Sequence, residues 1–120
     1  MSILDRCRSS ELTLLGSVAI DEEISYIVDY EKKVKALRAV SIIHEYLPIT
    51  SDVLNLTKSY ESYGLHLFDA LHCACATVGN SIFLTTDDQI ISAIRKNPTF
   101  GLIAHNPASW LMRVKYEDNQ

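Results

Sequence analysis

Carboxylates in the segment from Gly64 to Asp88 are the residues of this chain best suited to chemistry. The segment reads GLHLFDALHCACATVGNSIFLTTDD. Its pattern predicts an amphipathic helix that opens with Asp69, a Gly-Asn stop, a short apolar strand, and two carboxylates, Asp87 and Asp88, where that strand ends. Such acids can lie along one edge of an α/β sheet, where ligands bind in open α/β folds. With a third carboxylate, this edge would hold a divalent cation and could hydrolyse phosphate esters.

An earlier helix offers the third acid. Ser17 is expected to cap a helix over 18–30, in whose first turns the dipole favours acids. Three acids occur there: Asp21, Glu22 and Glu23. Spacing alone does not choose among them, and capping preference by itself explains an acid at each of these helix starts. In a parallel sheet, however, such an acid can converge on Asp69 and Asp87. Oxygen-only ligands of this kind favour Mg²⁺ or Mn²⁺ over Zn²⁺.

The elements that must position these acids alternate along the chain. Strands are expected over 11–16, 47–50, 81–84 and 102–104. Helices are expected over 3–9, 18–30, 32–46, 52–63 and 68–78, from a cap at Thr86 or Asp87 to Lys96, and after Asn106. The helix over 68–78 is expected to bury Leu71, Ala74, Cys75 and Val78, and the tail from Lys115 is polar. This alternation predicts parallel pairing, right-handed crossovers and one three-layer α/β/α domain over residues 1–120.

Composition narrows the class of protein. Of the 120 residues, 48% are hydrophobic and 22% are charged, which is ordinary for a compact soluble domain. No apolar run approaches the roughly 18–20 residues that span a membrane. Cys73 and Cys75 point to different faces of one helix, so the three cysteines suggest reduced thiols in a cytoplasmic protein rather than a metal site.

The net charge of −4 argues against non-specific adhesion to nucleic acid over the whole surface. A nuclease could still bind phosphates through metal ions and a local basic patch. Candidate patches are Lys32, Lys33, Lys35 and Arg38; Arg95 and Lys96; and Arg113 and Lys115. Each patch taken alone is better explained as a solvated helix face.

Three blocks of the chain together resemble one family. GLHLFDALHCACA resembles the G-x-x-x-x-D-A-L-H-x-A-x-A helix of PIN domains, and FLTTDDQI resembles their L-T-x-D strand exit. GSVAIDEEI resembles an earlier family segment, a Ser followed six residues later by Glu-Ile. The order and spacing of the blocks match over about residues 10–112. PIN domains are metal-dependent nucleases, mostly of single-stranded or looped RNA, and many are toxins of VapC-type toxin–antitoxin pairs.

This resemblance implies roles for individual residues. It selects Glu23 over Glu22 and makes Glu23, Asp69 and Asp87 the metal-site acids of a two-metal phosphodiester hydrolysis with Mg²⁺ or Mn²⁺. It gives supporting roles to Thr85, Thr86, Asp88 and His72. A packing histidine is the competing interpretation of His72, because i,i+3 adjacency to Asp69 only shows contact. RNA is the implied substrate, and an antitoxin protein is a possible partner.

One part of the family pattern has no counterpart here. The pattern normally begins with a hydrophobic strand, central in the sheet, that ends in an Asp. Only ten residues precede Glu11, and they resemble the end of a helix. We therefore expect exposed strand edges and weak or absent activity. Three interpretations stay open: a shortened or mis-started chain, a remnant that binds RNA or protein without catalysis, or a homodimer whose sheets pair across subunits. The interpretation as a receiver-like domain is less favoured, because no acidic pair follows an N-terminal strand.

Overall fold

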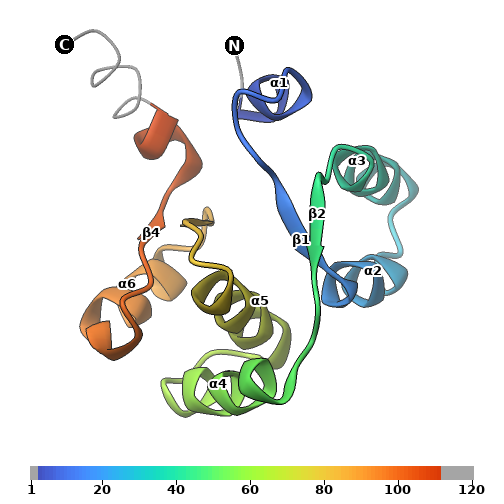
Figure 1. Ribbon diagram of the computed structural model, residues 1–120. Helices are drawn as coiled ribbons and strands as arrows, with labels where there is room; N and C mark the ends of the chain where they lie inside the picture. Colours follow the sequence, from blue (N-terminus) through green and yellow to red (C-terminus); the bar gives the residue numbers. More distant parts are fainter. Residues whose placement is uncertain (1–2, 112–120) are drawn as a thin grey trace, which may run out of the picture. The chain divides into compact units, whose positions relative to one another are not determined.

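The computed structural model describes residues 3–111, and their contacts divide the chain after Thr50 into two compact units. The first unit contains α1 (Ile3–Arg8), β1 (Leu15–Ser17), α2 (Val18–Ser25), α3 (Tyr30–Val40) and β2 (Glu45–Leu47) (Figure 1). The second contains α4 (Ser51–Ser62), α5 (Leu67–Val78), β3 (Phe83–Leu84), α6 (Asp88–Lys96), the 3₁₀ turn η1 (Pro98–Phe100) and β4 (Ala104–His105). None of the helices in this part of the chain is long and apolar enough to cross a bilayer.

The first unit is built on the parallel pair β1–β2. Gly16 of β1 lies opposite Tyr46 of β2. A side chain at Gly16 would crowd the segment before β2, because its Cβ would lie 2.6 Å from Cδ1 of Ile43. His44 joins the two strands twice: its N–H donates to the Leu14 carbonyl, and its Nδ1 accepts from the Leu14 N–H, both at 2.9 Å. Close backbone approach and this double link set the register.

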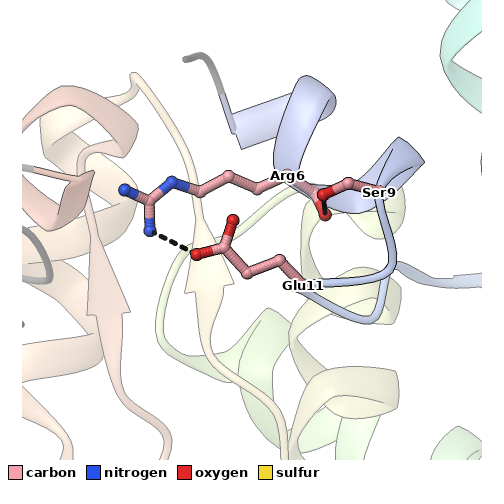
Figure 2. Close-up of polar contacts among 3 residues, drawn as sticks. All are labelled: Arg6, Ser9 and Glu11. Carbon is pink, nitrogen blue, oxygen red and sulfur yellow. Dashed lines mark hydrogen bonds and ion pairs between the residues drawn. The ribbon is translucent and has the colours of Figure 1, made fainter.

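A tight turn after α1 explains why β1 starts later than expected. The carbonyl of Arg6 accepts from the N–H groups of Glu11 and Leu12, at 2.9 and 3.1 Å, and from Oγ of Ser9 at 3.1 Å. The guanidinium of Arg6 also meets Glu11, with Nη1 3.4 Å from Oε1 (Figure 2). The start of the apolar run is therefore part of the turn, and the strand begins at Leu15 rather than at Glu11.

Two helices of the first unit are shorter in the structure than the sequence predicts. The helix expected over 18–30 ends at Ser25. Asp29 caps a new helix by accepting from the Lys32 N–H at 2.9 Å. That helix ends at Val40 rather than at residue 46, because residues 45–47 pair with β1. The strand expected over 47–50 is this pair, shifted toward the N-terminus.

The second unit has its core between α4 and α5. Tyr60 is buried and its hydroxyl lies 2.8 Å from Oγ1 of Thr77. The small buried residues of α5 allow the two helices to approach closely: Ala70, Cys73, Ala74, Cys75 and Ala76. Of the four residues expected to be buried here, Ala74 and Cys75 are, Leu71 is half-buried, and Val78 is 50% exposed because it ends the helix beside Gly79. Gly64, at φ 95°, provides the left-handed turn between α4 and α5.

Parallel strands alternating with helices confirm the α/β class. Phe83 pairs with Ala104 and Leu84 with His105 in parallel register, so the last strand lies at 104–105 rather than 102–104. The described strands form two small parallel pairs, β1–β2 and β3–β4, in place of the one sheet expected. A final helix begins at Pro107, where Oδ1 of Asn106 accepts from the Ala108 N–H at 2.9 Å. The polar tail expected from Lys115 lies outside the described residues.

Candidate functional site

Asp87 is held firmly at the exit of β3. Its Oδ1 accepts from the N–H groups of Gln89 and Ile90, at 2.9 and 3.3 Å, and so caps α6. Its own N–H donates to Oγ1 of Thr85 at 3.1 Å. The Thr85 N–H in turn donates to the His105 carbonyl of β4, also at 3.1 Å. The carboxylate is solvent-exposed, and its second oxygen takes no part in the cap. This geometry presents one carboxylate oxygen at a fixed place at the carboxyl end of a strand.

Asp69 lies in the first turn of α5, where the helix dipole favours an acid. It is half-buried. Burial, and after it the negative charge of Asp69, together raise the pKa of the Cys73 thiol to about 12. The carboxylate therefore lies close to the helix face that carries Cys73, which is fully buried. Asp69 is thus an acid on the inner side of its helix rather than a freely solvated one.

Glu23 is exposed and lies in the last turn of α2, since that helix ends at Ser25. The N–H of Tyr26 donates to the Glu23 carbonyl at 3.2 Å as the helix terminates. The sequence pattern placed Glu23 in the first turns of a longer helix, where an acid is favoured. In its observed position the dipole disfavours an acid. Helix stability therefore does not account for Glu23.

The supporting residues are distributed around these acids. Thr85 holds the backbone of Asp87, as described above, while Thr86 is exposed in the same loop. Asp88 is exposed at the first position of α6. His72 is half-buried on α5, one turn beyond Asp69. These placements do not distinguish between a site role and a packing role for His72, so its role stays a prediction.

The donor chemistry of these acids fits a hard divalent cation, because carboxylate oxygens are the ligands that Mg²⁺ and Mn²⁺ prefer. Asp69 and Asp87 belong to the second unit, whereas Glu23 belongs to the first. Within residues 3–111, no three His, Cys, Asp or Glu side chains are grouped closely enough to hold a metal ion. The described residues therefore do not by themselves form a complete metal centre, and the convergence of the three acids stays a prediction.

A groove on α6, lined by both polar and apolar surface, is a feature that the sequence pattern did not single out. It has a volume of about 420 Å³ and lies within the second unit. Its lining consists of Tyr63, Asp88, Gln89, Ser92, Ala93, Lys96 and Asn97. The signal that could have found it is the spacing of Gln89, Ser92 and Lys96, which places three polar side chains on one helix face.

Comparison with known proteins identifies the family. The model of the PIN domain matches residues 4–97, which span α1 to α6 and contain Glu23, Asp69 and Asp87. A search of curated proteins gives no significant match. The match starts and ends somewhat earlier than the expected 10–112. Because it covers most of the chain, the chain belongs to the PIN domain family, whose members have nuclease-type activity and generally use divalent metal ions.

Proposed function

We propose that this chain is a ribonuclease of the PIN family that hydrolyses phosphodiester bonds in single-stranded or looped RNA with Mg²⁺ or Mn²⁺. The observation that carries the proposal is the carboxylate of Asp87. It lies at the exit of β3 within the family match and is fixed by one oxygen only. A side chain needed only as a cap would make the same two hydrogen bonds to the N–H groups of α6. A role as a metal ligand would instead use the exposed second oxygen, so the test concerns that oxygen.

Asp69 and Asp87, joined by Glu23, are the residues that would hold the cation. A bound divalent ion supplies positive charge beside the phosphate and lowers the pKa of a water molecule. The chain's own contribution is positional. Thr85 and the first N–H groups of α6 hold Asp87, and the first turn of α5 holds Asp69 in a half-buried position. Carboxylates held in place before binding would fix the position of the cation, so little reorganisation would be needed when charge develops on the phosphate.

We propose that the activity of this chain is weak, because the assigned site contains three acids, Glu23, Asp69 and Asp87, and no fourth acid is assigned to it. Toxin function, an antitoxin partner and a homodimer belong to the same proposal. The two-stranded parallel pairs support the homodimer, because each pair leaves edge strands that a second chain could extend.

The alternative is a PIN-like module that binds RNA or protein without catalysis. One observation favours it: the part of the chain that the structure describes contains no group of three metal-ligating side chains. A protein of this kind would keep the PIN fold and a nucleic-acid surface but would not hydrolyse RNA.

Incubation of the purified chain with end-labelled single-stranded RNA and Mn²⁺ separates these possibilities. Cleavage that disappears with EDTA, and in both Asp69→Asn and Asp87→Asn, supports the enzyme. Asp52→Asn is the matched control, because Asp52 is an exposed acid in the first turn of α4 and lies outside the three blocks. Cleavage that survives both site substitutions contradicts the assigned acids. Absence of cleavage together with retained RNA binding supports the non-catalytic module.

A further inference from the structure

We propose that the groove on α6 binds one nucleotide of a single-stranded RNA, next to the phosphate that Asp87 would face. The inference rests on the proposed function and adds a substrate-positioning surface to it. Its lining combines an aromatic ring, amide and hydroxyl groups, one ammonium group and one carboxylate. These are the groups that stack on a base, bind its edge and bind a phosphate. The groove has a volume of about 420 Å³ and is open to solvent, so an extended single strand could lie along it.

Tyr63 is the platform for the base. Its ring is half-buried and is held from within the unit by two other rings. The ring centroid of Tyr60 lies 5.9 Å away in an edge arrangement, and that of Phe100 lies 6.2 Å away. Tyr60 is itself anchored by its contact with Thr77. A ring that is already fixed loses little conformational entropy when a base stacks on it.

The polar face of α6 gives the groove a direction. Asp88 begins the helix directly after Asp87, and Lys96 ends it. At 1.5 Å per residue these two positions are about 12 Å apart along the axis. Lys96 therefore offers its charge to a phosphate at the end of the groove remote from Asp87. Gln89 and Ser92 lie between them, and Asp88 can accept from a base amino group or a ribose hydroxyl.

Asn97 completes the end of the groove near Lys96. Its Nδ2 donates to the Ala93 carbonyl at 2.7 Å, which fixes the side chain at the end of α6. The amide is therefore held in one orientation before any ligand binds. An amide oriented in this way can contribute to reading a base edge without further ordering.

The test is the binding of fluorescein-labelled oligoadenylate, measured by anisotropy in EDTA so that neither a metal ion nor cleavage contributes. Tyr63→Leu should weaken binding by between about fivefold and about 150-fold, the range that corresponds to the loss of one stacked base. Tyr63→Phe keeps the ring and should bind as the unaltered chain does. Thermal melting of Tyr63→Leu and Tyr63→Phe shows whether the aromatic group has stayed folded.

Two further variants avoid the core. Lys96→Ala should weaken binding and reduce the slope of log affinity against log salt by about 0.7, the value for one phosphate contact on a single strand. Ser92→Glu changes an exposed groove residue and should weaken binding by repelling phosphate. Lys58→Ala is the matched control: it makes the same change in net charge at an exposed site on α4 and should leave binding unaltered.

Absence of RNA binding by the unaltered chain, or equal effects of Lys96→Ala, Ser92→Glu and Lys58→Ala, would overturn the groove proposal. Its failure is distinguishable from failure of the proposed function. Cleavage with unaffected groove variants leaves the enzyme and removes the groove. Binding that depends on the groove without any cleavage leaves the groove and removes the enzyme.

Discussion

Asp87 allows the cap and the metal-ligand roles to be separated by two substitutions at one position. Asp87→Ala removes the acceptor for the N–H groups of Gln89 and Ile90, which lie 2.9 and 3.3 Å from Oδ1. Loss of an N-cap costs about 1 kcal/mol, with a range of about 0.5–2. For a chain of this size we expect the melting temperature to fall by about 4 °C. Asp87→Asn keeps an oxygen in the same place and removes only the charge, so its cost should be a few tenths of a kcal/mol.

The assay pairs thermal melting followed by circular dichroism with RNA cleavage in Mn²⁺. We expect Asp87→Asn to melt close to the unaltered chain and to lose cleavage, and Asp87→Ala to lose both stability and cleavage. Asp88→Asn is the stability control, because it removes a charge from the same helix turn without removing a cap bond. Equal melting of Asp87→Ala and Asp87→Asn would refute the capping argument. Full cleavage by a stable Asp87→Asn would refute the metal-ligand argument.

Three other predictions concern the framework that carries the site. His44→Ala removes the acceptor for the Leu14 N–H and should lower the free energy of unfolding by about 1 kcal/mol in urea titrations. His44→Asn should recover part of this loss, because its Oδ1 can replace Nδ1 as the acceptor, and an equal loss in both variants would contradict the hydrogen bond. Gly16→Ala should lower the free energy of unfolding by about 1–3 kcal/mol, because the new Cβ would crowd Cδ1 of Ile43. This loss should be smaller in the Ile43→Val background, which lacks Cδ1. If the losses of the two single variants simply add in the double variant, the contact with Cδ1 does not cause the loss. The Cys73 thiol has a pKa of about 12 in the folded chain and near 9.0 in the unfolded chain. The free energy of unfolding should therefore be unaffected below pH 9 and fall as the pH rises from 9 toward 12. Cys73→Ala should flatten this slope in thermal melts across that range, and an unchanged slope would contradict the assignment.

Local signals predicted the second unit better than the first. The bounds of α4, α5 and α6 fall within a residue or two of expectation, because Gly64, Gly79 and Asp87 mark their ends by chemistry that acts within a few residues. In the first unit, the end of α3 is decided by the pairing of residues 45–47 with β1. That pairing joins residues thirty positions apart, and the helical period of the sequence does not contain it. The Asp29 cap lies inside the stretch over 18–30 that was expected to be one helix, so it was not predicted.

The candidate site divides in the same way. The loop from Thr85 to Asp87 was predictable, since a strand exit and a helix cap use hydrogen bonds between near neighbours. Parallel pairing was predictable from the alternation of strands and helices, and the structure confirms it. The predicted convergence of Glu23 with Asp69 and Asp87 would depend on packing between distant parts of the chain. The spacing of residues in the sequence is compatible with such packing but does not determine it.

The three acids differ in how far helix capping and the helix dipole explain their positions. Asp87 caps a helix and Asp69 lies in a favourable first turn, so either acid would be stabilising without any ligand. Glu23 lies in the last turn of α2, where the helix dipole opposes a negative charge. The shorter α2 therefore removes the structural explanation that the sequence had offered for Glu23. The helix dipole therefore favours Asp69 and Asp87 at their positions but not Glu23, and the assignment of Glu23 as a cation ligand stays a prediction from the family resemblance.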